Sequence, residues 1–147
     1  MLMTTKKLAR FVGWDRKKMA DDLATGHLGF VPPTTASMRL WDIDDGASAL
    51  FYVDLLSEGY PVKLAGTLAT RLREAARANP DADRITMVRL ANGSGFEGPA
   101  DAVNVANGWG SDTWVRTALT VDVRNLRARL QREIDADAQI VGDAGDE

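Results

Sequence analysis

The stretch that decides the fold is TTKKLARFVGWDRKKMADDLATG, residues 4–26, in which two short helical patterns are joined by a Gly-Trp-Asp turn. Apolar residues recur at helical spacing in both halves, first at Leu8, Ala9 and Val12, then at Met19 and Leu23. Gly13 can adopt the positive φ of a sharp turn, Asp15 can cap the second helix, and Gly26 can close it. We therefore expect two helices that lie nearly crosswise, as in a helix-turn-helix.

Charge is unevenly distributed along the 147 residues, whose formal net charge is −3. Residues 1–41 have a balance of +4, so the rest of the chain must hold −7. The basic residues of this segment are Lys6, Lys7, Arg10, Arg16, Lys17, Lys18 and Arg39, and its acidic residues are Asp15, Asp21 and Asp22. This asymmetry suits a basic head, able to bind nucleic acid, on an acidic body. Charge alone equally allows a merely solvated basic face.

A proline-containing arm, HLGFVPPTTASMRLW, spans residues 27–41. Pro32-Pro33 favours extended backbone without amide donors, so we expect a projecting loop. Hydroxyl and guanidinium donors follow it at Thr34, Thr35, Ser37 and Arg39. An arginine here can reach a phosphate or a minor-groove edge; the alternative is a plain surface hairpin with Arg39 in solvent. Phe30 and Trp41 are expected to be core residues that fix the arm to the helices.

Two longer helices are expected next. Residues 42–58 begin with an acidic turn, place Leu50, Val53 and Leu56 on one face, and are closed by Gly59. Residues 61–78 begin with proline and carry Leu64, Leu68 and Leu72, with alanines beside them. Asn79-Pro80 ends this helix, and we expect a domain boundary there, between residues 1–78 and 79–147.

The second segment changes to strand-like periodicity. We expect strands over residues 84–90, 100–108 and 113–123, with a turn-rich connection, ANGSGFEGP, after the first. Residues 125–140 predict a helix with Leu126, Leu130 and Ile134 on one face, followed by an acidic, frayed tail. The predicted fold class is therefore α+β, in which a helical head precedes a small antiparallel sheet and a C-terminal helix.

Residues 6–68 resemble the DNA-binding domain of MerR-type transcriptional regulators, a winged helix-turn-helix. The landmarks of that domain correspond here to Leu8-Ala9, Gly13, Gly26 with Leu28, Pro32-Pro33, Met38-Arg39-Leu40-Trp41, Asp44-Asp45 and Gly59. The middle of the second helix departs from the family, because Ala20-Asp21-Asp22-Leu23 replaces an Arg-Tyr-aromatic-Glu run. Two carboxylates facing phosphates would be repelled, so base readout is expected from Arg16, Lys17 and Lys18 at the helix N-terminus.

The resemblance implies a sequence-specific regulator that binds double-stranded DNA as a homodimer on two-fold related half-sites. The second helix would enter the major groove, and the arm would contact the backbone or the minor groove. The expected DNA-binding residues are Lys6, Arg16, Lys17, Lys18, Thr34, Thr35, Ser37 and Arg39. Two alternatives stay open: a protein-interaction module that has lost base readout and binds, for example, RNA polymerase or a phage factor, and an excisionase-like factor that bends DNA.

Other functions find little support in the sequence. Cysteine is absent and there is one histidine, so thiolate and multi-imidazole metal sites are excluded. No catalytic constellation and no cofactor motif is recognisable, and we expect a non-enzyme. Trp109, Trp114 and the nearby glycine-rich loops are candidates for an effector site, although hairpin turns explain the glycines. Without an apolar span or leader, a cytoplasmic, bacterial protein that does not enter a membrane is expected.

Overall fold

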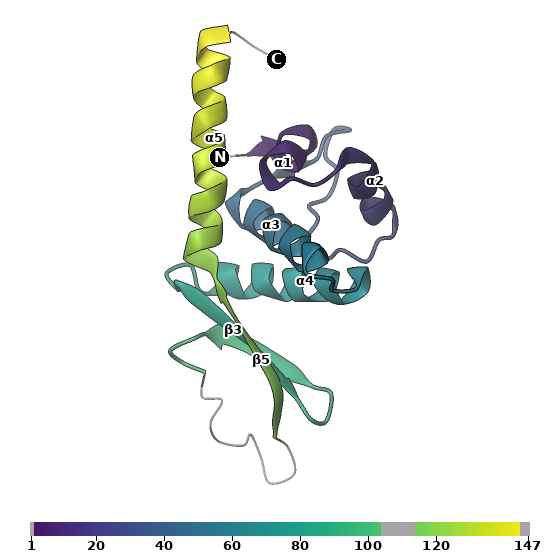
Figure 1. Cartoon of the computed structure of the whole chain (residues 1–147), viewed down its shortest axis with the longest axis vertical. Coiled ribbons are helices and arrows are strands. Elements are labelled where there is room, and N and C mark those ends of the chain that lie inside the picture. The colour runs from purple at the N-terminus through teal and green to yellow at the C-terminus, as the bar shows by residue number, and fades with distance from the viewer. Residues whose placement is uncertain (1, 104–113, 145–147) are drawn as a thin grey trace.

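The computed structural model describes residues 2–103 and 114–144, with side chains described up to Gln139. In these ranges the chain forms an α+β fold of five helices and two small antiparallel sheets, which confirms the expected fold class (Figure 1). The helices are α1 (Thr5–Val12), α2 (Arg16–Ala24), α3 (Ile43–Ser57), α4 (Val62–Ala78) and α5 (Val123–Ala144). The strands are β1 (Met3–Thr4), β2 (Leu40–Trp41), β3 (Arg84–Leu90), β4 (Gly95–Pro99) and β5 (Val115–Asp122).

The turn between α1 and α2 follows the sequence prediction. Gly13 has φ 72°, in the left-handed region, and it ends α1 directly after Val12. The Asp15 side chain accepts a 3.1 Å hydrogen bond from the backbone N–H of Lys18 and so caps α2. The predicted apolar face of α1, Leu8, Ala9 and Val12, is buried.

Helix α3 lies at the centre of the fold. It begins with a capping box, in which the Asp42 and Asp45 side chains each accept a hydrogen bond from the other's backbone N–H. Residues 45–52 are buried without interruption, because α1, α4 and α5 all contact α3. The predicted stripe is therefore only partly right: Leu50 is buried, whereas Val53 and Leu56 are half-buried and Leu55 takes the interior position.

The larger sheet has the antiparallel order β4-β3-β5, and it lies on the opposite side of α4 from α1 and α2 (Figure 1). In β3, Ile85 pairs with Pro99 of β4 on one side and with Val121 of β5 on the other. The prediction of a second strand over residues 100–108 is wrong for residues 100–103, which are described and do not form a strand. The strand is instead Gly95–Pro99, from the segment expected to be a turn, and residues 104–108 lie outside the described range.

Helix α5 starts directly after β5 and runs beside α3 and α1 (Figure 1). Its predicted apolar face is confirmed, since Leu126, Leu130 and Ile134 are all buried. The helix includes residues 142–144 of the expected frayed tail, and residues 145–147 lie outside the described range. None of the helices in the described ranges is both long enough and apolar enough to cross a membrane.

One hydrophobic core joins the N-terminal helices to the sheet and to α5. Met3 and Leu8 belong to the same buried cluster as Ile85, Val121 and Leu130. The predicted boundary at residues 78/79 falls between α4 and β3, yet the core continues across it. The two segments therefore support each other's folding, and the division into two domains stays a prediction.

Candidate nucleic-acid interface

A hollow of about 540 Å³ lies where α1 meets the start of α2. Its lining includes three basic side chains, Lys6 and Arg10 from α1 and Arg16 from α2. Lys6 and Arg10 are one helical turn apart, so they project from the same side of α1. All three are exposed, and Trp14, which is 3% exposed, contributes an apolar wall. The hollow thus gathers three basic side chains from two helices around one concave surface, together with the carboxylate of Asp15.

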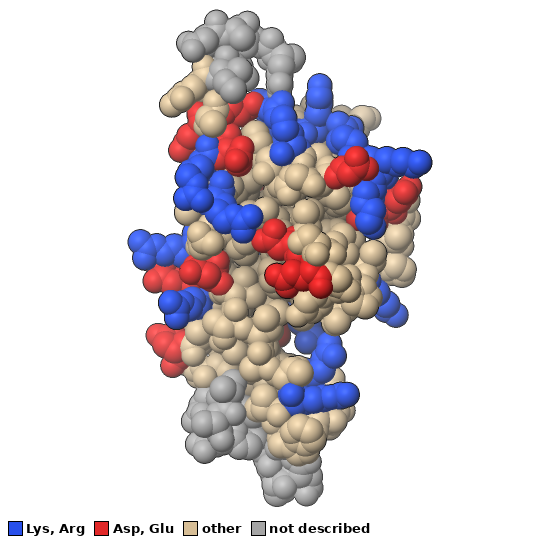
Figure 2. Space-filling model, viewed as in Figure 1, with Lys and Arg blue, Asp and Glu red and all other residues tan. Residues whose placement is uncertain are grey.

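Basic side chains are numerous over α1 and α2, with some acidic side chains among them, and basic and acidic side chains are also mixed along α5 (Figure 2). Within α2, Arg16, Lys17 and Lys18 form the exposed first turn. Lys18 is partly engaged, because its Nζ lies 2.8 Å from Oδ1 of Asp22. The side chains of Arg16 and Lys17 form no hydrogen bond or ion pair with any described residue, so their charges are available to a ligand.

Asp22 is buried and does not face outward, which corrects the expectation that it would repel phosphates. Its side chain accepts a 3.1 Å hydrogen bond from Nε1 of Trp14 in addition to the bond from Lys18. Burial raises the pKa of the neighbouring Tyr52 hydroxyl, and the charge of Asp22 raises it further, so Tyr52 remains a neutral phenol. Asp21, by contrast, is exposed. A single carboxylate therefore remains on the outer face of α2 in its central turn.

Three aromatic rings pack together beside the hydrogen bond between Trp14 and Asp22. Trp14 and Tyr52 have centroids 5.2 Å apart, Phe30 and Tyr52 5.6 Å, and Trp14 and Phe30 6.4 Å, all in tilted arrangements. Phe30 and Trp41 are fully buried, as expected. Nε1 of Trp41 also donates a 2.9 Å hydrogen bond to Oγ1 of Thr5, and this bond fixes the base of the arm to α1.

Residues 35–38 of the arm form a tight hairpin. Backbone hydrogen bonds of 2.7 and 2.9 Å link Thr35 with Met38, and Ala36 and Ser37 between them have φ of 51° and 63°. Positive φ at both central residues is typical of a type I′ turn, a conformation that non-glycine residues rarely adopt. The predicted projecting loop is therefore a compact hairpin, with Thr34, Thr35 and Ser37 exposed near its tip.

Arg39 is half-buried beside this hairpin. Its Nη2 donates a 3.1 Å hydrogen bond to Oγ1 of Thr34, and its Nε is buried without a hydrogen-bond partner among the described residues. The guanidinium is thus directed along the arm by Thr34. The structure places Arg39 and Thr34 together, and it places Lys6 and Arg16 together around the hollow.

Sequence reasoning did not include Arg10 among the site residues, although its spacing of four from Lys6 is a usable signal. It also missed the carboxylate that Arg10 and Lys7 contact. Asp137 of α5 forms an ion pair with Arg10, and its Oδ2 lies 3.3 Å from Nζ of Lys7. No local pattern connects positions so far apart in the chain. Asp137 therefore competes with any phosphate for the basic surface of α1.

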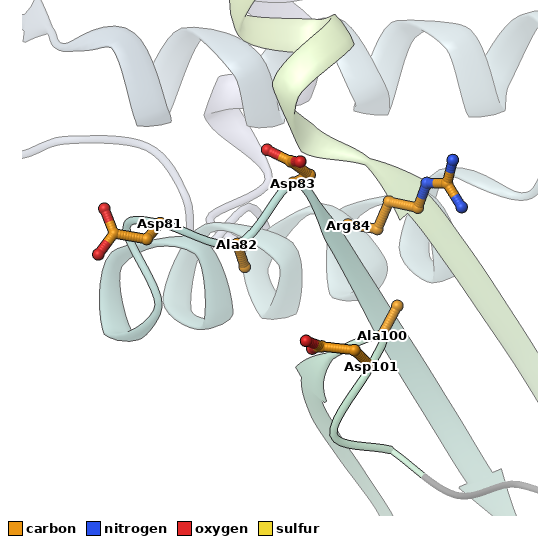
Figure 3. A pocket seen from close by; sticks show the side chains of 6 residues that line it. All are labelled: Asp81, Ala82, Asp83, Arg84, Ala100 and Asp101. Carbon is orange, nitrogen blue, oxygen red and sulfur yellow. The ribbon is translucent and has the colours of Figure 1, made fainter.

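A second hollow, of about 500 Å³, lies at the junction of α4 with β3 and has the opposite charge. Its lining includes the carboxylates of Asp81, Asp83 and Asp101, which Figure 3 shows spread around it, with Arg84 directed away from them. No group of three or more His, Cys, Asp or Glu residues in the described part of the chain is arranged to hold a metal ion. This surface would repel nucleic acid.

Comparison of the chain with protein-family models and with curated proteins finds no match.

Proposed function

We propose that the protein binds double-stranded DNA through α1, α2 and the arm, and acts as a sequence-specific transcriptional regulator of the MerR type. The observation that carries the proposal is the hollow at the α1–α2 junction, with Lys6, Arg10 and Arg16 around it. Phosphate contacts position a protein on a duplex, and clustered Lys and Arg side chains supply them. Here the cluster lies at the N-terminus of α2, where the helix dipole also favours an anion.

The outer face of α2 is suited to approach base edges. Arg16 and Lys17 are exposed at its start, and Ala20 and Ala24 are exposed along its length. Short side chains allow the backbone to come close to a groove, whereas Arg and Lys can bond to guanine. The inward position of Asp22 supports this role, since one acidic side chain, Asp21, remains on that face.

The arm would contact the sugar-phosphate backbone beside the groove. Thr34, Thr35 and Ser37 offer exposed hydroxyls, and Arg39 lies next to them. A hydroxyl or guanidinium at this position gives register and affinity without reading sequence. Homodimerisation on two-fold half-sites belongs to the same proposal, with the resemblance to MerR-type proteins as its support. A cytoplasmic location and contact with RNA polymerase are further parts of this proposal.

A second candidate is a protein-interaction module on the same body. Exposed apolar side chains at the arm favour it: Met38 is 52% exposed, Leu40 is 40% exposed, and Leu2 near β1 is 60% exposed. Such residues are enriched where a partner protein docks. In this case the protein would bind no duplex, and Met38→Ser would weaken capture of its partner. An excisionase-like factor would instead bind DNA and bend it measurably.

The test is selection of bound duplexes from a random pool, followed by affinity measurements at several salt concentrations. The variant Lys6→Gln/Arg16→Gln removes two charges from the hollow. Its matched control is Arg84→Gln/Arg116→Gln, which removes two exposed charges from the larger sheet. We expect the slope of log affinity against log salt to fall by about 2 in the first variant, roughly 0.9 for each lost phosphate contact, and to stay unchanged in the control.

Equal losses in the two variants would show that the contact surface lies elsewhere. Absence of binding above background to every duplex would leave the interaction module as the better reading. Circular dichroism of both variants checks that the fold is retained.

A further inference from the structure

A cavity of about 310 Å³ lies between α4 and the larger sheet, away from the proposed DNA-binding surface. Figure 1 shows α4 crossing the end of the sheet, and α4 contacts β3 and β4. Apolar side chains make up much of the lining: Leu64 and Leu68 from α4, Met87 from β3 and Leu119 from β5. The three leucines are half-buried, so a ligand that covers them would gain free energy from the hydrophobic effect.

Two arginines line the same cavity, Arg71 from α4 and Arg89 from β3. Gly95, at the start of β4, is close to Arg71 in space and is paired with Arg89 in the sheet. Arg89 is the direct antiparallel partner of Gly95, and Nη1 of Arg71 lies 3.0 Å from the position that a Cβ on Gly95 would occupy. A side chain at residue 95 would therefore meet the Arg71 guanidinium. Two arginines from different elements therefore line one largely apolar cavity.

Neither guanidinium has a counterion in the described part of the chain. Arg71 and Arg89 are both half-buried, yet no described carboxylate lies within 4.0 Å of either. Three other half-buried arginines are paired with carboxylates, Arg73 with Asp45, Arg127 with Asp44 and Arg129 with Asp54. Glu97 lies opposite Met87 on the same sheet and forms no ion pair with the two arginines. Two unpaired, partly desolvated like charges cost free energy that an anion would recover.

We propose that this cavity binds a small amphipathic carboxylate, with its apolar body between α4 and the sheet and its carboxylate between Arg71 and Arg89. Arginine presents a fork of donors that matches a carboxylate, and charge-assisted bonds of this kind are the strong ones. The volume lies near the lower end of the range for ligand pockets, about 300–1,000 Å³, which favours a compact body of one or two rings or a short acyl chain. This role rests on the proposed regulatory function, in which such a ligand would be an effector.

The first experiment compares three probes of the same shape by isothermal titration calorimetry on the full chain, without DNA. The probes are naphthalene-1-acetate, its neutral amide, and the cationic 2-(1-naphthyl)ethylammonium. We expect the anion to bind at least about tenfold more tightly than the amide, because hydrogen bonds to charged groups are worth more than neutral ones, and we expect the cation to bind least.

The second experiment changes the cavity itself. Arg71→Gln and Arg89→Gln should each weaken binding of the anion by about tenfold or more and should leave binding of the amide nearly unchanged. Arg84→Gln is the matched control, since Arg84 is on the same strand as Arg89 but faces the opposite side of the sheet. Leu68→Trp should fill the cavity and weaken binding of all three probes. Arg71→Glu/Arg89→Glu should reverse the order, so that the cation binds more tightly than the anion.

Equal binding of the three probes would overturn the proposal. So would equal losses of anion affinity in Arg89→Gln and Arg84→Gln. The absence of any binding of naphthalene-1-acetate at millimolar concentration would overturn it as well. Thermal unfolding of each variant identifies any that fails to fold, and the reversed preference of the double glutamate variant is a gain that misfolding cannot produce. Because no DNA is present, this outcome is separate from that of the DNA-binding proposal.

Discussion

The side chain of Leu130 in α5 occupies the space next to Gly46 of α3 that a Cβ at residue 46 would need. A Cβ built on Gly46 would lie 2.4 Å from Cδ2 of Leu130 and 3.0 Å from Cε of Met3. Real Cβ atoms do not approach other atoms so closely, so a side chain at residue 46 would push the two helices apart or displace Leu130. This contact is one reason why α5 and the N-terminal helices share a core.

We therefore expect Gly46→Ala to destabilise the protein by about 1–3 kcal/mol, the usual cost of overpacking a core, although alanine is the better helix former. Urea unfolding measures the change. A double-mutant cycle with Leu130→Ala provides the control, because removing Leu130 opens the space that the new methyl group needs. If the two costs simply add, the close contact does not limit the packing.

The bond between Trp14 and Asp22 predicts a second stability effect. Asp22→Ala would leave the buried indole N–H without its acceptor and should cost about 2–3 kcal/mol. Asp22→Asn should cost less, because an amide oxygen can still accept from Trp14. Asp21→Ala is the matched control, since the exposed Asp21 should change stability by no more than about 0.5 kcal/mol. Similar losses at both positions, measured by urea unfolding, would contradict the buried role of Asp22.

The ion pairs of Asp137 with Lys7 and Arg10 predict a gain in DNA affinity. Asp137→Asn removes a carboxylate that competes with phosphate, so the variant should bind DNA several-fold more tightly and with a steeper salt dependence. Asp135→Asn makes the same change of charge two residues earlier on α5, at a carboxylate that accepts from Gln131. Fluorescence anisotropy titrations compare the two. An identical gain in both variants would show that net charge alone is responsible.

The capping box of α3 predicts a dependence of stability on pH. Burial raises the pKa of Asp42, but the backbone N–H of Asp45 and the charge of Arg77 lower it more, so the net pKa lies below its usual value. Because the folded value is lower than the unfolded one, ionised Asp42 stabilises the fold above about pH 4. That contribution is lost as the pH falls through the folded pKa.

Asp42→Asn should therefore flatten the loss of stability in acid, since asparagine still caps a helix but does not ionise. Asp45 acts in the opposite direction: burial raises its pKa, and the charge of Asp42 adds to this, so its ionisation opposes folding as the pH rises. Thermal unfolding between pH 3 and 7 gives the measurement. Parallel profiles for the variant and the parent would mean that Asp42 does not contribute to the acid transition.

The helices could be predicted because their signals are local. Gly13 and Asp15 mark the ends of α1 and α2 by backbone preference and side-chain capping, and both act within a few residues. Strand β4 could not be predicted in the same way. Its sequence, Gly95–Pro99, contains two glycines and a proline, which indicate a turn, and pairing with β3 overrides that preference.

The site could be predicted only in part, because charge is visible in a sequence and orientation is not. The basic cluster near Arg16 was evident, whereas the inward direction of Asp22 depends on an indole eight residues earlier. The counterion Asp137 and the placement of Arg71 and Arg89 around one cavity arise from tertiary packing between distant segments. A charged residue is expected at the surface when only its type is known. The sequence therefore does not identify the carboxylates and guanidinium groups that tertiary packing directs into the interior.

The attachment of α2 has a consequence for its local stability. The nine-residue helix buries Met19 and Asp22, whereas residues 45–52 of α3 are all buried. Few buried contacts correspond to a small free energy of local opening. In hydrogen–deuterium exchange the amides of α2 should therefore exchange well before those of α3. A duplex that binds this helix would slow that exchange, so protection of α2 gives a direct record of occupancy.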